Sequence, residues 1–477
     1  MISSEEMAVV DANAAALGVP RKQLMESSGN AVARVVREVA DPGDAVALVC
    51  GRGNNGGDAF VTARFLSAFD VTVHLLGRAE TISTTIAREN WDALQSAELD
   101  AREVTDSAAL SLGDPDVVVD AMLGTGVTGA LREPEATAAR TMNDVDATVV
   151  SVDVPSGVDA DTGEAAGVAV DADHVVTFHD EKPGLESVDA AVTVADIGIP
   201  AAAERFVERG DLLRLSRDPT AHKGDFGEVR VVGGGPYTGA PALTAQAALR
   251  AGADLAYVSC PEGVAGEVQG YSENLIVDPL SGDRLAPNHV EGLLAAAGDA
   301  DCVVLGPGLG DHEGTLAAVR EFLAGFDGTA VVDADALQVV PDVDTDATLL
   351  CTPHQGELRK MGGETADDPG ERAALVEAFA ADLGATLLVK GAYDVVSDGE
   401  TTRLNRTGNP GMTVGGTGDV LAGVGGAMAC VLDPAGAGAV AAYANGRAGD
   451  LVVEEYGYGL TATDLLEAVP RALWPDD

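Results

Sequence analysis

The chain contains 477 residues, 46 % of them apolar, and this length fits two domains of roughly 200 to 250 residues better than one. Its 77 acidic and 29 basic side chains give a formal net charge of -48, which would repel nucleic-acid phosphates and anionic lipid. We therefore expect neither nucleic-acid binding nor membrane-surface binding. The acidic residues are dispersed and only five residues are lysine, as is typical of halophilic proteins, whose charge repulsion is screened in molar salt over about 3 Å.

The sequence predicts a soluble, cytoplasmic protein. Residues 1–10 are acidic and lack the basic and then apolar pattern of a signal peptide. Residues 420–431 are the nearest candidate for a membrane span, but they are short, rich in Gly and Ala, and end at Asp433-Pro434. The five cysteines are isolated, which favours buried apolar cysteines over a thiol nucleophile or a zinc site. We expect a homo-oligomer.

Short Val-rich runs alternate with Ala-rich stretches of helical period along both halves of the chain. In the first half, helices are predicted at residues 7–17, 21–39, 59–69 and 83–97, and strands at residues 45–50, 71–76, 117–120, 148–153 and 174–178. In the second half, strands are predicted at residues 228–232, 255–259, 302–305, 330–333, 348–351 and 386–390. This β–α alternation predicts two three-layer α/β/α domains with largely parallel sheets. The pattern breaks at residues 209–220, so we predict domains 1–214 and 215–477.

The first candidate site directly follows the strand at residues 45–50. There Gly51-Arg52-Gly53 precedes Asn54-Asn55-Gly56-Gly57-Asp58 and a helix. Glycines permit positive φ and close backbone approach to a ligand, and the start of a helix offers free amide N–H groups to a diphosphate. A simple turn would need only one or two glycines. The two amides followed by Gly-Gly-Asp therefore favour a ligand site.

Two more apolar strands of the first half end in a carboxylate. Asp120 precedes the loop Gly124-Thr125-Gly126, and Asp153 precedes Ser156. One such Asp could cap a helix. However, the carboxyl ends of parallel strands share one edge of a sheet, where ligands bind. Three polar strand ends in one domain are therefore expected to converge on a single site.

Together, these motifs resemble the YjeF N-terminal family of NAD(P)HX epimerases over most of residues 1–212. The resemblance implies a Rossmann-like domain whose hydrated dinucleotide contacts two segments: Asn54, Asn55, Gly56, Gly57 and Asp58 in one, and Gly124, Thr125, Gly126, Val127, Thr128, Gly129 and Ala130 in the other. It also implies a potassium ion bound by Asn55, Asp120 and Ser156, with Asp153 at the reacting ring. Lys182-Pro183-Gly184-Leu185 also matches a family segment.

The substrate of this family defines the chemistry expected of Asp153. Its hydroxyl is on the ring carbon next to the ring nitrogen, and inversion of that centre needs a nearby acid–base group, for which Asp153 is the candidate. Arg52 and Ala59 depart from the residues usual in the family. Arg52 either contacts a phosphate or points to solvent.

The second candidate site lies in residues 409–419. Here Gly415-Gly416-Thr417-Gly418-Asp419 leads directly into an apolar stretch of helical composition. A glycine loop at a helix N-terminus binds oxyanions and phosphates through backbone amides and the helix dipole. Asp419 could accept the proton of a hydroxyl that is being phosphorylated. The alternative is a helix-capping carboxylate beside glycines that allow close packing.

This glycine loop resembles the ribokinase-like superfamily, and further motifs narrow the resemblance. These motifs are His222 to Gly227, Gly233 to Gly235, Gly239 to Pro241, Leu305 to Gly310, Asp333 to Leu337, Thr352 to Glu357 and Lys390 to Asp394. The series resembles the ADP/ATP-dependent NAD(P)H-hydrate dehydratases over nearly all of residues 220–474. It implies nucleotide binding by Lys390, Gly391, Ala392, Tyr393, Asp394, Gly415, Gly416, Thr417 and Gly418, and substrate contacts from Ala240, Gly308, His354 and Asp419. It implies that Asp419 is the catalytic base.

The two resemblances imply a bifunctional enzyme that acts on NADHX and NADPHX. The first domain would interconvert the R and S epimers, and the second would dehydrate the S form to NAD(P)H at the expense of ADP or ATP with Mg²⁺. Phosphorylation of the ring hydroxyl would create a good leaving group, because hydroxide itself leaves poorly. The sequence contains no Walker motif, which excludes a P-loop NTPase.

Two other functions are compatible with parts of the pattern. The Gly-Thr-Gly-Asp loop also occurs in vitamin and sugar kinases, but the setting of His354 and the fused first domain argue against them. Some relatives of the first domain are non-catalytic adaptors in RNA-decay complexes, in which the catalytic loop has degenerated. Here Asn54 to Asp58, Asp120 and Asp153 are intact, and the acidic charge disfavours RNA.

Overall fold

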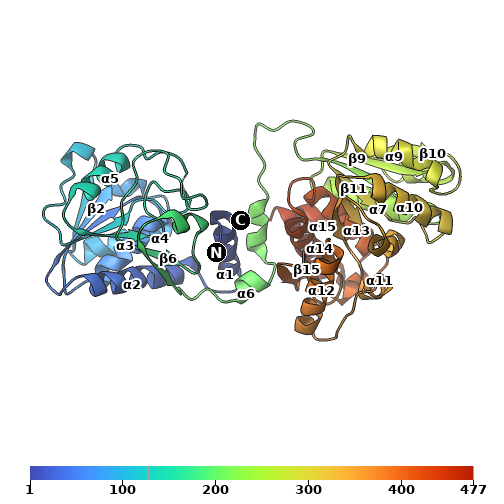
Figure 1. Cartoon of the computed structure of the whole chain (residues 1–477). Coiled ribbons are helices and arrows are strands. Elements are labelled where there is room, and N and C mark those ends of the chain that lie inside the picture. The colour runs from blue at the N-terminus through green and yellow to red at the C-terminus, as the bar shows by residue number, and fades with distance from the viewer. Residues whose placement is uncertain (127, 476–477) are drawn as a thin grey trace. The chain divides into compact units, whose positions relative to one another are not determined.

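The computed structural model describes residues 1–126 and 128–475. The chain forms two compact units, Met1–Ala203 and Glu204–Asp477, and Figure 1 shows the course of the chain through both. The short helix α6 (Ala202–Arg205) spans the division. Among the described residues, no helix is both long and apolar enough to cross a membrane.

The first unit is built on a seven-stranded sheet in the order β3-β2-β1-β4-β5-β6-β7, and all neighbouring strands are parallel. The strands are β1 (Ala45–Cys50), β2 (Asp70–Leu76), β3 (Asp100–Val104), β4 (Val117–Ala121), β5 (Thr148–Val152), β6 (His174–Phe178) and β7 (Ala191–Ala195). The strand order reverses between β1 and β4. The loops after these two strands therefore diverge and leave a crevice at the carboxyl edge of the sheet, as in Rossmann folds.

Helices cover both faces of this sheet. They are α1 (Ser4–Ala16), α2 (Arg21–Val39), α3 (Asn54–Phe65), α4 (Thr85–Ser96) and α5 (Glu135–Asp144). Figure 1 shows α5 on one side of β2 and α2 and α3 on the other. Alternate strand residues point to opposite faces: Leu48 joins the buried cluster under α2 and α3, whereas Val49 joins the one under α5. This layering confirms the predicted three-layer architecture.

The second unit contains a nine-stranded sheet in the order β10-β9-β8-β11-β12-β13-β14-β15-β16. The strands are β8 (Glu228–Val232), β9 (Leu255–Pro261), β10 (Ile276–Leu280), β11 (Cys302–Leu305), β12 (Thr329–Val332), β13 (Thr348–Cys351), β14 (Thr386–Val389), β15 (Asp394–Ser397) and β16 (Thr402–Asn405). The pairs from β10 to β14 are parallel, and β15 and β16 extend the sheet in antiparallel fashion.

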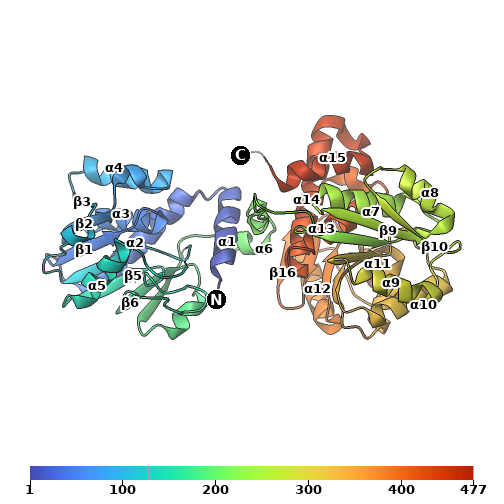
Figure 2. The ribbon, with the colours of Figure 1, turned by 90° about the horizontal axis from the view of Figure 1, so that it is seen from above.

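The helices of the second unit also lie on both faces of its sheet. They are α7 (Gly239–Arg250), α8 (Glu262–Gly270), α9 (Val290–Ala297), α10 (Glu313–Gly325), α11 (Gln355–Lys360), α12 (Pro369–Leu383), α13 (Thr417–Met428), α14 (Pro434–Tyr456) and α15 (Ala462–Leu473). In Figure 2, α7 and α15 lie on one side of β9, and α9 and α10 lie on the other.

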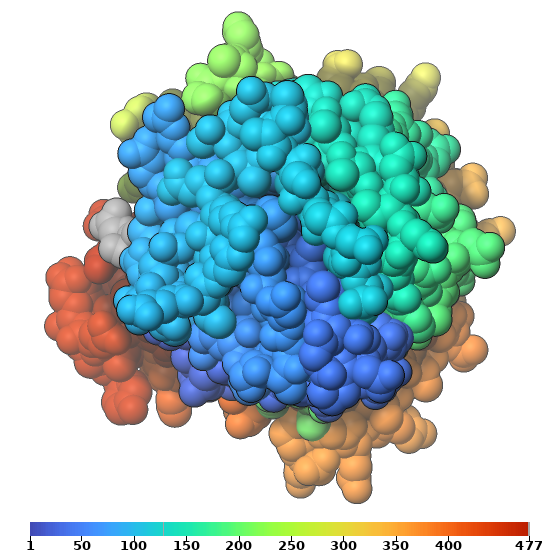
Figure 3. Space-filling view, turned by 90° about the vertical axis from the view of Figure 1, so that its left-hand side faces the viewer, coloured from blue at the N-terminus to red at the C-terminus, as the bar shows by residue number. Residues whose placement is uncertain are grey.

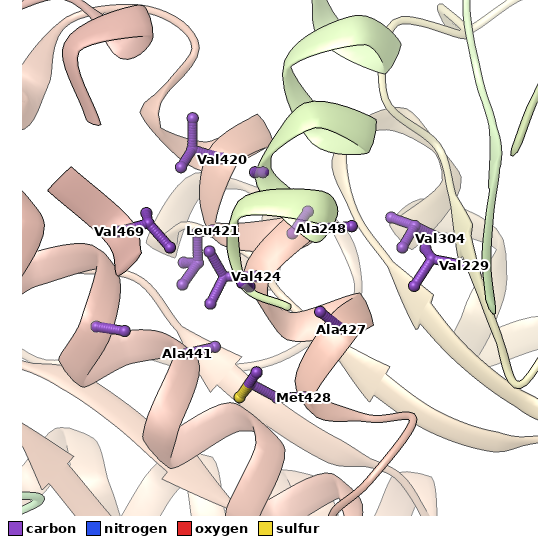
Figure 4. Packing of buried hydrophobic residues seen from close by; sticks show 14 of the residues in the cluster. Val229, Ala248, Val304, Val420, Leu421, Val424, Ala427, Met428, Ala441 and Val469 are labelled. Atoms are coloured by element: carbon purple, nitrogen blue, oxygen red, sulfur yellow. The ribbon is translucent and has the colours of Figure 1, made fainter. Parts of the chain in front are cut away.

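Helix α13 is central to one of these layers. Figure 4 shows its apolar residues between Ala248 of α7 and Val469 of α15, with Val229 and Val304 of the strands nearby. A Cβ on Gly426 would come within 2.5 Å of the Val304 side chain. The Gly/Ala-rich composition of α13 therefore reflects close helix packing and not a membrane span.

The predicted strands occur with small shifts at their ends, but five strands were missed: β3, β7, β10, β15 and β16. Strand β3 is mostly polar, and β10 contains Pro279. Strands β15 and β16 have only four residues each. None of these strands has the long Val-rich run of a fully buried strand.

Two further details differ from the predictions. Helix α3 begins at Asn54 and not at residue 59, so the Asn-Asn-Gly-Gly-Asp motif forms the first turns of a helix. Residues 204–214, which we had assigned to the first domain, contact the second unit. There the Arg403 guanidinium lies 3.0 Å from Asp211 Oδ2, and Val207 N donates to Leu404 O.

Candidate active sites

A pocket of about 690 Å³ lies in the first unit at the carboxyl edge of its sheet. The polar and glycine residues that line it include Asp11, Arg21, Arg52, Asn54, Asn55, Asp58, Gly124, Thr125, Gly126, Glu135, Asp153 and Lys182. In Figure 3, light-blue and teal segments of this unit border a dark-blue recess. The predicted convergence of three strand ends therefore occurs, and α1 and α2 add residues that the sequence did not single out.

The two glycines of the first motif allow close packing. We expected them to provide positive φ, but neither Gly56 nor Gly57 adopts it. Instead, a Cβ on Gly56 would clash with the carbonyl oxygen of Gly51, and a Cβ on Gly57 would lie 2.7 Å from Met25 Cε. The glycines thus let α3 begin directly against the end of β1. Asn54 and Asn55 line the pocket as a result, whereas Gly56 and Gly57 do not.

Asp153 directly follows β5 in a strained backbone conformation. Its φ of 69° lies in the left-handed region that non-glycine residues rarely adopt. Its Oδ1 lies 3.3 Å from the Thr177 hydroxyl, which donates to it, and 3.4 Å from Lys182 Nζ. Its Oδ2 would lie 3.3 Å from a Cβ on Gly124. The carboxylate is therefore held on one oxygen and faces the second glycine loop with the other.

Two further carboxyl groups lie in the same pocket. Burial is the largest cause that raises the pKa of Asp58 well above its usual value, and the nearby charges of Asp153 and Asp11 raise it further. Burial also raises the pKa of Asp11, an effect that Arg21 opposes. Asp58 is therefore protonated more readily than an exposed Asp. Asp11 lies in α1, and a single Asp on a helix gave no sequence signal for this role.

Of the residues expected to bind potassium, Asn55 lines the pocket, whereas Asp120 and Ser156 are buried and do not line it. Asp120 is fully buried and accepts hydrogen bonds from the Ser156 hydroxyl at 2.6 Å and from the Ser156 amide at 2.8 Å. Burial raises the pKa of Asp120, although these hydrogen bonds oppose the effect. Leu123 N donates to Ser156 Oγ, and the next residue, Gly124, approaches Asn55: a Cβ there would lie 3.5 Å from Asn55 Cγ.

The carboxylate, hydroxyl and amide oxygens that these side chains offer suit a hard cation. Asn55 Nδ2 is buried and has no hydrogen-bond partner within residues 1–126 and 128–475. Because Nδ2 is a hydrogen-bond donor, its missing partner is an acceptor, such as an oxygen of a bound substrate, and not the cation itself. No group of three His, Cys, Asp or Glu side chains suited to a metal occurs among the described residues, so the oxygen ligands would include Ser and Asn.

The other predicted residues of the first site are more peripheral. Thr128, Gly129 and Ala130 are exposed and do not line the main pocket, and Val127 lies outside the described residues. Arg52 does line the pocket, where its guanidinium lies 4.0 Å from Glu135 Oε1.

The second site is built around the N-terminus of α13. Gly416 caps this helix with a φ of 97°, and a Cβ there would lie 2.8 Å from the Ala462 side chain. Thr417, Gly418 and Asp419 form the first turn, whose amide N–H groups have no acceptor within the helix. The loop therefore presents amides beside the carboxylate of Asp419, and positive φ is required at Gly416.

Lys390 connects this loop to two acidic residues. Its Nζ lies 2.9 Å from Asp333 Oδ1 and 3.9 Å from Glu357 Oε2, and a Cβ on Gly418 would lie 3.4 Å from it. The pKa of Asp419 is raised to about 7: burial is the largest cause, the charges of Asp333 and Glu357 add to it, and Lys390 opposes it. Asp419 is thus poised to exchange a proton near neutral pH. The sequence did not indicate the part played by Asp333 and Glu357.

His354 caps helix α11. Its Nδ1 accepts hydrogen bonds from the amides of Gly356 and Glu357, at 2.9 and 3.0 Å. The neutral ring therefore carries its proton on Nε2, and the side chain is 59 % exposed. His354 also forms an isolated parallel bridge with Lys390, which places its backbone beside the loop of Asp419. Its Nε2 lies 3.6 Å from Glu357 Oε1, so both ring nitrogens are near the first turn of α11.

The remaining predicted residues form two groups. Gly308 has a φ of 74°, and a Cβ there would lie 3.3 Å from Ala240 Cβ, so these two positions are neighbours. In the other group, Asp394 Oδ1 accepts the Gly391 amide and Oδ2 accepts Asn405 Nδ2. Burial raises the pKa of Asp394 to about 6. Asp394 therefore stabilises the loop in which Ala392 and Tyr393 are exposed.

Comparison with known proteins assigns both units. The family profile described as NAD(P)H-hydrate dehydratase matches residues 229–471, and the profile described as YjeF-related protein N-terminus matches residues 21–184. The chain is 44 % identical to the bifunctional NAD(P)H-hydrate repair enzyme Nnr of Pyrobaculum aerophilum over 491 residues, which cover 99 % of this chain and 98 % of that protein. The chain belongs to the family of bifunctional NAD(P)H-hydrate repair enzymes.

Other members and structures agree with this family. The Nnr protein of Methanothermobacter thermautotrophicus is 42 % identical over 492 residues, with 98 % of this chain and 95 % of that protein covered. A ribokinase-like superfamily protein from Enterococcus faecalis matches with a TM-score of 0.50 at 24 % identity, and covers 56 % of this chain and 95 % of its own. This second likeness shows the fold alone. The family and the ribokinase-like fold predicted from the sequence are thus confirmed.

Proposed function

We propose that the chain repairs hydrated nicotinamide cofactors in two steps, with the epimerase in the first unit and the dehydratase in the second. The observation that carries this proposal is Asp419, a carboxyl group with a pKa of about 7 beside the free amides of a glycine loop. Family membership favours this function over a vitamin kinase or an RNA-decay adaptor. The acidic composition supports a cytoplasmic, salt-adapted protein, and we propose that it is a homo-oligomer.

In the first unit, Asp153 is the proposed acid–base group. Its fixed position at the end of β5 supports proton transfer at the hydroxyl-bearing ring carbon. The hydroxyl would take up a proton from the Asp153 carboxyl group and leave as water as its C–O bond breaks, with the ring nitrogen supplying electrons. A water molecule would then add to the opposite face and return a proton to the Asp153 carboxylate. Asn54 and Asn55 lie at the start of α3, where backbone and side-chain N–H groups can donate to the diphosphate or the carboxamide of the substrate.

A potassium ion held by Asn55, Asp120 and Ser156 is part of this proposal. The buried carboxylate of Asp120 and the adjacent Ser156 hydroxyl suit it. When bound, such an ion supplies positive charge beneath the loop that contains Gly124. Asp120 and Ser156 themselves fix the ends of β4 and β5 relative to one another.

In the second unit, Asp419 is the proposed base for phosphoryl transfer. It would take the proton of the substrate hydroxyl as the oxygen attacks the terminal phosphorus of ADP or ATP. Phosphate would then leave with the C–O bonding electrons, the ring nitrogen would form an iminium, and loss of a proton from the adjacent carbon would restore the dihydronicotinamide. The amides of Gly415 to Gly418 suit the charged oxygens of the transferred group.

The nucleotide would bring Mg²⁺ to this site. Mg²⁺ binds chiefly through nucleotide phosphates, keeps several waters and needs only one or two protein carboxylates. Asp333, Glu357 and Asp419 offer carboxylates there. When bound, the ion offsets negative charge on the phosphates. We propose ADP as the preferred donor, with the loop from Lys390 to Asp394 and Gly418 in contact with it.

Separate assays of the two activities in the full-length chain test this assignment. Without nucleotide, interconversion of purified epimers of hydrated NADH, followed by chromatography, reports the first unit alone. With ADP and Mg²⁺, the rise of NADH absorbance from the S epimer reports the second. We expect Asp153→Asn to lower only the first activity and Asp419→Asn only the second, each by about a thousandfold, which leaves a measurable residual rate. Loss of both activities in either variant, or of neither, would contradict the proposal.

A further inference from the structure

Lys182 is a fully buried lysine at the base of the first pocket. Its side chain is 1 % exposed, and its Nζ donates hydrogen bonds to Phe178 O at 2.7 Å and Asp180 O at 3.0 Å. The same Nζ lies 3.4 Å from Asp153 Oδ1. A buried ammonium is costly unless it is paired and hydrogen-bonded. A lysine in this place therefore calls for a reason beyond solubility or packing.

The chain around Lys182 is rigid. Pro183 begins the 3-10 helix Pro183–Ser187, and Leu185 is buried. A Cβ on Gly184 would clash with the carbonyl oxygen of Asp159 and would lie 2.6 Å from Gly163 N. Only glycine fits there, so residues 182–185 are held tightly against residues 159–163. The Lys-Pro-Gly-Leu segment thus fixes the stem from which the ammonium reaches Asp153.

The hydrogen bonds of the ammonium define what it can do. An ammonium has three N–H donors, and three acceptors surround this one: two backbone carbonyls and the Asp153 carboxylate. Two carbonyls accept hydrogen bonds from it and Asp153 lies at ion-pair distance, so these three groups fix the direction of the ammonium and favour a role through Asp153. Its contact with Asp153 falls on Oδ1, the oxygen that also accepts the Thr177 hydroxyl. The other oxygen, Oδ2, remains directed at the Gly124 loop.

We propose that Lys182 is the positioning residue of the epimerase reaction. It holds Asp153 Oδ1 so that Oδ2 faces the hydroxyl-bearing carbon of the substrate, and it balances the charge of that carboxylate among Asp11 and Asp58. This inference rests on the proposed epimerase function of the first unit. A purely structural alternative is that Lys182 only ties the turn at residues 178–180, which includes His179 with a φ of 69°.

Substitution of Lys182 in the full-length chain separates these roles. Lys182→Met removes the charge and the donors, and Lys182→Arg retains both in a different shape. Lys22→Met is the matched control, since Lys22 is an exposed lysine paired with Glu89. Epimer interconversion is measured without nucleotide, as kcat and KM. Dehydration of the S epimer by the same samples checks the second unit, and a thermal melt followed by circular dichroism checks the fold.

We expect Lys182→Met to lower kcat for epimerisation by about a hundredfold with KM changed less than threefold, as for a misplaced catalytic group. The kcat of Lys182→Arg should be about tenfold higher than that of Lys182→Met. The control Lys22→Met should have the wild-type kcat. In an Asp153→Asn background, adding Lys182→Met should lower kcat for epimerisation by less than about threefold, because Lys182 acts through Asp153.

Three results would overturn the inference: a folded Lys182→Met protein with wild-type kcat, a loss confined to KM, or full additivity with Asp153→Asn. If Lys182→Met unfolds the first unit, Lys182→Arg is compared with wild type, alone and in the Asp153→Asn background. A wild-type kcat, a loss confined to KM, or full additivity with Asp153→Asn would then overturn the inference. If the wild-type protein does not interconvert the epimers at all, the proposed function itself fails, and this result is distinct from a failure of the inference.

Discussion

The proton equilibrium of Asp419 makes the dehydratase reaction dependent on pH in a defined direction. The pKa of this carboxyl group is about 7, with burial as the main cause. A general base must be ionised to act. With a pKa of about 7, the ionised fraction is roughly ten elevenths at pH 8 and one eleventh at pH 6. We therefore expect kcat/KM for the S epimer to fall about tenfold between these values, whereas an Asp with an ordinary pKa would show no fall.

The assay is NADH formation at saturating ADP and Mg²⁺ between pH 5.5 and 8.5. Because the nucleotide phosphate also titrates, with a pKa of about 6 to 7, two variants identify the group that titrates. Asp333→Asn removes a negative charge that raises the pKa of Asp419. The fall of kcat/KM on the acid side of the pH profile, its acid limb, should therefore move to lower pH by about one unit. Lys390→Gln removes a positive charge that lowers this pKa, so the limb should move to higher pH.

The two variants are matched because their charges affect Asp419 in opposite directions. A limb that stays at the same pH in both variants would assign it to the nucleotide and refute the role of Asp419. A flat profile in the wild-type enzyme would also refute it. Shifts of the same sign in both variants would contradict the electrostatic reasoning, although they would leave the identity of the base open to the Asp419→Asn assay.

Three other predictions concern the glycine loop, the cation and salt. Gly416→Ala should destabilise the second unit by roughly 1 to 3 kcal/mol and lower dehydratase activity, because φ is 97° and a Cβ would meet Ala462. Gly415→Ala should leave the stability nearly unchanged, because a Cβ there meets nothing within 4 Å. A thermal melt compares the pair, and equal losses of stability would contradict this reasoning. Ser156→Ala should raise the potassium concentration needed for half-maximal epimerisation, measured by KCl titration in sodium-free buffer; an unchanged midpoint would exclude Ser156 as a ligand. Transfer from molar to millimolar KCl should lower the melting temperature, since the net charge is -48 and screening is lost. An unchanged melt would count against salt adaptation.

The sequence was most informative where several signals coincide. The Val-rich strands β1, β8 and β11 appear at their predicted bounds, because fully buried parallel strands are nearly continuous apolar runs. The convergence of Asn55, Asp120 and Asp153 was predicted for a geometric reason: parallel strands end at one edge of the sheet. Short or polar strands such as β3 and β16 were missed because their burial depends on neighbours that are distant in sequence.

The parts of the sites that escaped prediction are those that depend on tertiary contacts. Asp11 enters the first pocket from α1, and no local motif marks it. The pairing of Lys390 with Asp333 joins residues that follow two different strands, β14 and β12. Gly56 and Gly57 do not adopt the positive φ that glycine permits. Their small size instead lets α3 approach Gly51 and Met25 closely, which only the assembled structure reveals.

The most direct test of the account is the yield of NADH from a mixture of both epimers. The full-length protein is incubated with an equal mixture of R- and S-hydrated NADH, ADP and Mg²⁺ in potassium buffer, and NADH is followed to completion by absorbance. The account predicts recovery of all the hydrate as NADH, with recovery in the Asp153→Asn variant stopping near half within the same time. A wild-type yield that stops at half, or no NADH at all, would contradict it.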